Sequence, residues 1–466
     1  MVVPNRDAPT SGSGSGHGSA APVRPPTLTP TVSFTALSAG ALRVFPSPVT
    51  PSVSSASPLS QRAAVSPATS TALSLARRSP VSPHDGSRRQ SHDASSSSET
   101  DITTELVIVD EPPFKFGGAD EYDMKLLWFY TTETYASFSV EYGKIPFIDR
   151  ILKSTIPKFA FQSPFLMDCI LGLSALHMQS LNLSVPQSKA ISYRARAFAG
   201  YRQAIEKADP KDFPALLVCS LLLTAVSSEL FREADTKPLY IIDWMIVWRG
   251  IGLIFDIIPV ETLYNAGLEK LFSRPAFDLN QAALHIPNNL LFMVSSIKEG
   301  DDEFAHKSAY YDTLKFLGGV YCELEAGFSP VLSLRIITWF TFLPKPFVEF
   351  ARNHRPRALV ILAHYLAFLK LVPNVWWLAG VGDRGIQDIV DTLGQEWQSL
   401  LSVPAAAMQL SDRVELAKLI QGNHAWEPST EKASITPPMA IVNNEGEEVA
   451  YDQQRGWVPL FHAARS

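Results

Sequence analysis

Apolar residues recur along most of the chain at helical spacing, and in three stretches they fill every side of the predicted helix. Residues 165–181 follow Ser163 and Pro164, a pair suited to a helix start, and are apolar nearly all round. Residues 213–226 repeat this pattern. Because a helix without a polar face needs neighbours on all sides, we expect both helices to lie in the centre of the fold.

The third stretch lies within residues 356–401, around which the other segments are expected to pack. It starts with a proline, runs for about four apolar turns and stops at Pro373. The adjacent Trp376 and Trp377 follow, and an amphipathic pattern continues from Gly382 to the end of the stretch. This pattern predicts two helices that pack on each other through the turn that carries Trp376 and Trp377, which we call the tryptophan corner.

The remaining helical patterns are amphipathic. Asp120 suits the cap of a first helix, and Pro186 opens a helix with a basic, solvated face. The pattern loosens between Pro275 and Asp302, as an insertion or loop would, and no strand pattern of useful length occurs from residue 113 to residue 421. We therefore predict an all-α fold, a multi-helix orthogonal bundle or solenoid-like stack of helix pairs.

Composition divides the chain into three parts. Residues 1–112 are rich in Ser and Pro and have too few apolar side chains for a core, so they are predicted to be a disordered leader. Residues 113–421 hold the helical patterns and form one predicted domain. Residues 422–466 form a polar tail. The cluster around Trp457 in this tail is either an acidic-aromatic activation segment or an arm that docks its tryptophan on the core.

Charge and cysteine content limit the classes of function. Because the whole chain carries −6 and its first hundred residues carry about +4, the helical part and the tail together carry about −10, which suits a nucleic-acid backbone poorly. Cys169, Cys219 and Cys322 lie far apart within or beside apolar patterns, as buried reduced thiols do. The longest apolar runs are about a dozen residues, shorter than a membrane span, so no span is expected.

No pattern in the sequence indicates an enzyme. Phosphate-binding loops, nucleophile elbows, paired metal-binding cysteines and dinucleotide-binding turns are missing, so we predict no catalytic residues, no metal site and no cofactor. The carboxylates that a terpene-modifying helical enzyme needs are also missing from the apolar helices. His177 is expected to be a structural histidine, because no second ligand stands at metal spacing from it.

Several segments resemble one family. The resemblance rests on residues 339–382, which contain PRALVILAHYLAFLK followed by Trp376 and Trp377, and on four upstream segments, QSPFLMDCILGLSALHMQSLN, YRARAFAGYRQAI, FPALLVCSLLLTAV and Trp248-Arg249-Gly250. Together, residues 113–402 resemble the fungal-specific transcription factor domain of sterol uptake control-type zinc-cluster regulators. The resemblance implies a helical effector and ligand-sensing domain.

The sequence departs from this family at the DNA-binding end. Regulators of the family carry a zinc binuclear cluster built from six closely spaced cysteines, whereas the first cysteine here is Cys169, inside a predicted core helix. We expect this chain to lack the cluster and to make no direct contact with nucleic acid. Two explanations stay open: either the protein functions without the cluster, or the gene model has lost an exon.

We therefore predict a nuclear, also cytoplasmic, regulator of sterol, lipid or secondary-metabolite genes. It would bind an apolar, sterol-like ligand and act through transcription-machinery proteins, a DNA-binding paralogue or a homodimer. The alternative is a helical protein-interaction module, or dimerising antagonist, with no small-molecule ligand. The ligand-binding residues are predicted to be those that supply aromatic walls and a few polar groups. These residues are Trp248, Arg249, His364, Tyr365, Trp376 and Trp377.

Overall fold

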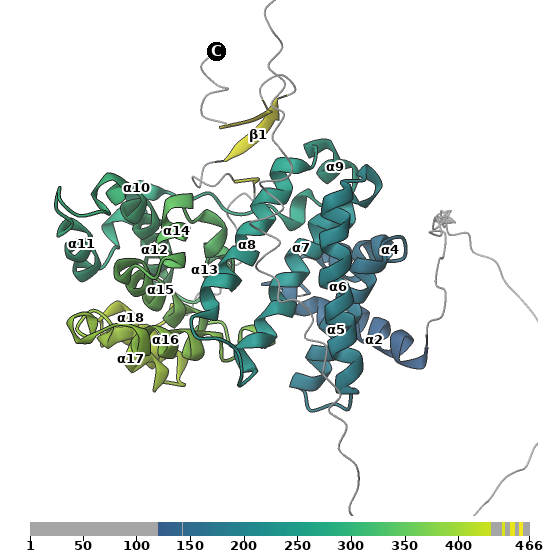
Figure 1. The fold of residues 1–466 in the computed structure, drawn as a ribbon, viewed down its shortest axis with the longest axis horizontal. Coiled ribbons are helices and arrows are strands. Elements are labelled where there is room, and N and C mark those ends of the chain that lie inside the picture. Colours follow the sequence, from purple (N-terminus) through teal and green to yellow (C-terminus); the bar gives the residue numbers. More distant parts are fainter. Residues whose placement is uncertain (1–119, 142, 430–439, 443–447, 453–455, 460–466) are drawn as a thin grey trace, which may run out of the picture.

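The computed structural model describes residues 120–141, 143–429, 440–442, 448–452 and 456–459. Within these ranges the fold is all-α, as predicted, apart from one short hairpin. The leader predicted for residues 1–112 lies outside the described residues. Two groups of helices flank α8 (Tyr240–Ile257), and Figure 1 shows them on either side of this helix.

The first group is built around two buried helices, α5 (Pro164–Ser180) and α7 (Phe213–Ser227), which pack on each other. α5 also forms an antiparallel pair with α6 (Gln187–Lys207). Gly200 allows the pair to approach closely, since a Cβ there would lie 2.7 Å from Phe165 Cβ. The other elements of this group are α2 (Glu121–Thr132), η1 (Thr134–Phe138), α3 (Pro146–Arg150), η2 (Ile151–Thr155), α4 (Ile156–Ala160), η3 (Pro210–Asp212), η4 (Ser228–Arg232), α9 (Val260–Asn265) and η5 (Glu269–Leu271).

The second group surrounds α15 (Pro356–Leu369), in which every residue from Ala358 onward is buried. The all-round apolar pattern of this segment therefore predicted its central position correctly. The other elements are α10 (Leu279–Leu284), α11 (Asn288–Ser295), η6 (Phe304–His306), α12 (Lys307–Ala326), α13 (Pro330–Thr338), η7 (Trp339–Phe342), α14 (Lys345–Arg352), η8 (Trp376–Leu378), α16 (Val381–Thr392), η9 (Gln395–Trp397), α17 (Ser402–Met408) and α18 (Arg413–Gln421).

Two details of the sequence-based prediction are wrong. The amphipathic helix expected to continue to Leu401 ends at Thr392, because Leu393 is extended and Gly394 follows before η9. The stretch between Pro275 and Asp302, expected to be an insertion or loop, contains α10 and α11. These two helices have six and eight residues, too few to establish a clear apolar period.

Parts of the tail pack on the helices. Trp426 is buried against the aromatic ring of Phe328 and donates its indole N–H to the carbonyl of Glu325 (3.2 Å). Ala440 forms an antiparallel bridge with Arg274. β1 (Val449–Asp452) pairs antiparallel with β2 (Gly456–Pro459), above α8 in Figure 1. The side chain of Trp457, predicted either to activate transcription or to dock on the core, lies outside the described residues.

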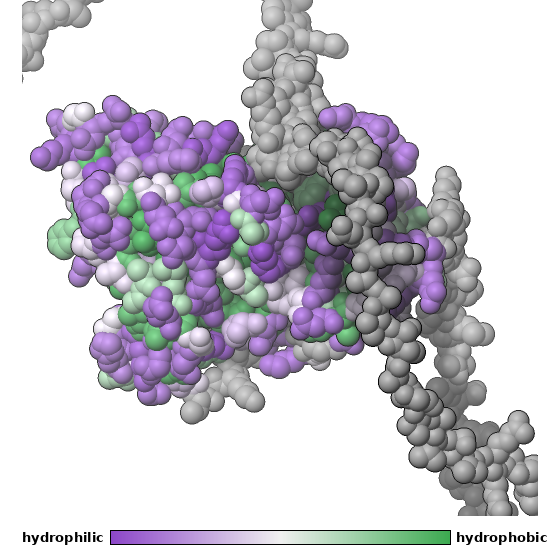
Figure 2. Space-filling model, turned by 60° about the horizontal axis from the view of Figure 1, so that its bottom comes forward, coloured by the Kyte–Doolittle hydropathy of each residue, from purple (hydrophilic) through white to green (hydrophobic). Residues whose placement is uncertain are grey.

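One described stretch, Pro210–Arg232, is long and apolar enough to cross a membrane. However, 78% of its apolar window is buried inside the fold, as expected for a core helix. Figure 2 shows one face of the molecule, on which hydrophobic residues form separate patches between hydrophilic ones. The apolar surface of the helices is therefore directed mainly to the interior.

Candidate functional site

A continuous chain of aromatic side chains joins α8 to the second helix group. The distance between neighbouring ring centroids is 6.3 Å for Trp377 and Trp248, 5.8 Å for Trp248 and Trp244, 5.5 Å for Trp244 and Phe340, and 4.8 Å for Phe340 and Tyr365. We call these five residues the aromatic chain. They come from η8, α8, η7 and α15, so four separate segments of the sequence meet here. Three of the predicted ligand-binding residues belong to this chain.

The tryptophan corner forms the end of the aromatic chain nearest to the first helix group. Trp377 is 1% exposed and stacks on Phe138 of η1, with ring centroids 5.9 Å apart. Trp376 stacks almost parallel on His177 of α5 at 4.7 Å. The corner is therefore held by the first helix group, whereas the sequence pattern had predicted only a contact between the two helices beside it.

Three predicted tryptophans share an unusual property. The indole N–H groups of Trp248, Trp376 and Trp377 are buried and have no hydrogen-bond acceptor among the described residues. The same is true of Trp339, which stacks on Tyr365 at 4.2 Å. A buried donor without an acceptor costs about 1–3 kcal/mol, so each requires an explanation such as a bound water or a ligand.

His364 and Tyr365 are neighbours in sequence but make contacts in different directions. His364 donates from Nε2 to the carbonyl of Leu400 (2.9 Å), and its Nδ1 lies 3.4 Å from the hydroxyl of Tyr321. Tyr365 donates to the carbonyl of Ile336 (2.8 Å). Both side chains are thus satisfied by internal partners, and only Tyr365 lies in the aromatic chain.

Arg249 lies one residue beyond Trp248 on α8 and donates from Nη1 to the carbonyl of Thr341 (3.2 Å). Arg274 reaches the hydroxyl of the same threonine. Burial lowers the pKa of Arg274 to about 10, and its guanidinium stands 4.5 Å from the ring of Phe342. The two guanidinium groups thus hold η7 against α8 and against the segment before α10. Because Phe340 belongs to η7, these contacts help to fix its place in the aromatic chain.

The two histidines near the site are held neutral by burial. Desolvation lowers the pKa of His177 to about 4 and that of His364 also to about 4. His177 shares a hydrogen bond between its Nδ1 and the hydroxyl of Thr134 (3.0 Å). Neither histidine belongs to a metal-binding group, since the part of the chain that the structure describes holds no cluster of three or more His, Cys, Asp or Glu suited to a metal.

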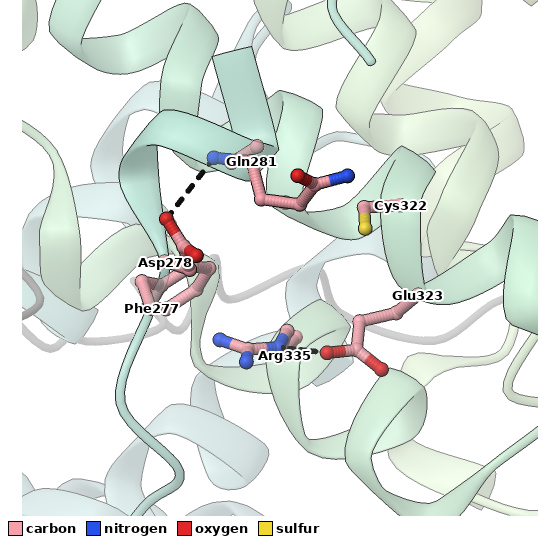
Figure 3. Close-up of a pocket in the computed structure, with 8 residues that line it drawn as sticks. Phe277, Asp278, Gln281, Cys322, Glu323 and Arg335 are labelled. Carbon is pink, nitrogen blue, oxygen red and sulfur yellow. Dashed lines mark hydrogen bonds and ion pairs between the residues drawn. The ribbon is translucent and has the colours of Figure 1, made fainter. Parts of the chain in front are cut away.

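A second site was missed by sequence reasoning. A pocket of about 80 Å³ lies between α10, α12 and α13, and Figure 3 shows Gln281 and Cys322 on one side of it and Glu323 and Arg335 on the other. Asp278 closes a third side. We call it the Arg335 pocket. Its residues are separated by up to about sixty positions and share no motif, so no sequence signal would have found them.

The chain is similar to several known fungal transcription factors. It is 23% identical over 350 residues to a Zn(2)-C6 fungal-type transcription factor of Gibberella zeae, with 68% of each chain covered. It is 23% identical over 296 residues to sterol uptake control protein 2 of Saccharomyces cerevisiae, covering 60% of this chain and 31% of that protein. It is 20% identical over 219 residues to Zn(2)-C6 fungal-type transcription factor afumD of Aspergillus fumigatus, covering 45% of this chain and 58% of that protein.

No family model matches the chain. The three relatives nevertheless support a fungal transcription factor family and a role in transcription regulation, which agrees with the resemblance found in the sequence. The match spans less than a third of the length of sterol uptake control protein 2.

Proposed function

We propose that this chain is a transcription regulator whose helical domain senses an apolar small molecule at the aromatic chain. The relatives support regulation, and the observation that supports a ligand is the set of buried indole N–H groups without acceptors. In this proposal the chain acts together with a partner protein, such as a DNA-binding paralogue.

The ligand would be large, apolar and equipped with an oxygen acceptor. Trp248 of α8 and Trp377 of η8 provide aromatic surface from two different elements, and the N–H of each lacks an acceptor among the described residues. A ligand that separates these two rings would gain apolar contact and would satisfy a donor that is unpaired in the closed fold. A sterol, with one hydroxyl on an apolar ring system, has this chemistry, and the name of one relative refers to sterols.

Direct binding tests this proposal. Full-length protein is titrated with a fluorescent sterol, and energy transfer from tryptophan reports binding. The variant Trp248→Phe keeps an aromatic ring and loses the N–H, so the Kd is expected to rise by about two- to tenfold. Trp426→Phe is the matched control, because the N–H of Trp426 already donates to Glu325. Absence of binding to the wild-type protein, or equal Kd values for wild type and Trp248→Phe, would count against the proposal.

A reporter assay tests the regulatory step. The full chain is fused to an unrelated DNA-binding domain, and reporter transcription is measured with normal and depleted sterol. The proposal predicts a reporter response that depends on sterol and is weakened by Trp248→Phe. A reporter that stays at the level of the DNA-binding domain alone under both conditions would contradict it.

Exposed apolar side chains favour a second candidate, a helical protein-interaction module or dimerising antagonist without a ligand. On α2, Met124 and Trp128 are 58% and 61% exposed and stand four residues apart, so they share one face. If this surface carries the function, Trp128→Ser weakens partner capture or self-association, measured by light scattering, and leaves sterol binding unchanged. The reverse pattern would leave the ligand-sensing proposal as the better account.

A further inference from the structure

The Arg335 pocket contains a buried donor without an acceptor. Arg335 is 8% exposed, donates from Nε to Glu323 (2.8 Å) and from Nη2 to the carbonyl of Ala276 (3.0 Å), and stands 3.9 Å from the ring centroid of Phe277. Its Nη1 is buried and has no partner among the described residues. The guanidinium is thus held in place by two hydrogen bonds and a ring contact, while its Nη1 group has no acceptor among the described residues.

Two carboxylates in the same pocket, the exposed Asp278 and the partly buried Glu323, also keep an oxygen without a partner among the described residues. Oε1 of Glu323 accepts from Arg335, and Oδ1 of Asp278 accepts the backbone N–H groups of Asn280 and Gln281 at the start of α10. Within the described ranges, the second oxygen of each carboxylate has no hydrogen-bond partner. With one guanidinium and two carboxylates, the pocket carries a net charge of −1, which favours a cationic group.

The size of the pocket limits its occupant. A single water needs about 10–15 Å³ of such space, so 80 Å³ accommodates a molecule of only a few non-hydrogen atoms. Part of its wall is formed where α10 and the segment before it lie against glycines of α12: at Gly319 a Cβ would stand 2.8 Å from the ring of Phe277. The pocket walls are therefore defined by close backbone packing as well as by side chains.

We propose that the Arg335 pocket binds a small primary amine that also carries an oxygen acceptor, as amino alcohols and small amino acids do. The ammonium group donates to the free oxygens of Asp278 and Glu323, and the oxygen of the ligand accepts from Nη1 of Arg335. This site is separate from the aromatic chain, so the regulator would respond to a nitrogen-containing metabolite as well as to the apolar ligand.

Ligand-observed saturation-transfer NMR on the full chain tests the proposal, with ethanolamine and glycine as probes and with propylamine, which lacks the oxygen, as the comparison. For ligands this small, a Kd of about 0.1–10 mM is expected. Asp278→Asn keeps a capping residue on α10 and removes one charge, so it should weaken ethanolamine binding by about tenfold. Glu323→Gln should act in the same direction.

Asp412→Asn is the matched control, because Asp412 caps α18 with the same pair of backbone hydrogen bonds and is not part of the pocket. Its binding should equal that of the wild type. The proposal is overturned if neither ethanolamine nor glycine binds, if propylamine binds as tightly as ethanolamine, or if both Asp278→Asn and Glu323→Gln, shown to be folded by circular dichroism, bind like the wild type.

Discussion

Close packing of α10 on α12 gives a quantitative prediction for Gly318→Ala. A Cβ at Gly318 would lie 2.2 Å from the carbonyl oxygen of Ala282 and 2.9 Å from Cγ1 of Ile286. Ordinary van der Waals contact begins at 3.4 Å, so α10 must move by roughly 1 Å. We expect the variant to lose about 2–3 kcal/mol of unfolding free energy, even after the better helix propensity of alanine is included.

Urea denaturation followed by circular dichroism measures this change. Gly252→Ala in α8 is the matched control, because a Cβ there has nothing within 4 Å. That variant should be stabilised by about 0.5–1 kcal/mol, since alanine favours a helix interior over glycine. If Gly318→Ala were as stable as Gly252→Ala, the close approach of α10 to α12 would be wrong, and with it the shape of the Arg335 pocket.

Three further predictions concern buried polar groups. The folded pKa of His364 is about 4 against an ordinary value of 6.5, so its contribution to stability is intact above pH 6.5, falls as the pH decreases, and is lost below about pH 4. This loss amounts to about 3 kcal/mol, and His364→Gln should flatten the pH dependence of the urea midpoint in this range. Asp388 accepts the backbone N–H of Leu239 (3.0 Å), so the variant Asp388→Ala should lower the unfolding free energy by about 2–3 kcal/mol in the same denaturation assay. An unchanged urea midpoint would refute this role of Asp388. Glu303 is 5% exposed and binds both Arg357 and the hydroxyl of Tyr310 at 2.8 and 2.6 Å, so Glu303→Ala should lower the unfolding free energy by about 3 kcal/mol, measured by thermal and urea unfolding.

The sequence allowed the central helices to be predicted because their signals are local. α5, α7 and α15 each combine an all-round apolar run with a proline in the first turn. The break at Leu393 was missed because apolar spacing continues through it to Trp397 and Leu401, and a single glycine does not by itself end a helix.

The candidate site was only partly predictable. Trp248 and Trp377 were both selected and do meet, since large aromatic residues in apolar segments favour a shared core. His364 was selected with them as a residue that could line the same pocket, yet it contacts Leu400, because consecutive helix residues are about 100° apart and only its neighbour Tyr365 reaches the aromatic chain. The positions of Arg335 and Asp278 depend on how α10, α12 and α13 pack, which single-sequence patterns do not specify.

Our proposal that this chain regulates transcription can be tested by nascent-transcript sequencing after rapid, induced degradation of the protein in its native cells. We expect a defined set of transcripts to change within minutes, before secondary effects arise, and sterol depletion to alter the same set. Nascent transcripts that remain unchanged after the protein has been removed would contradict a role in regulation.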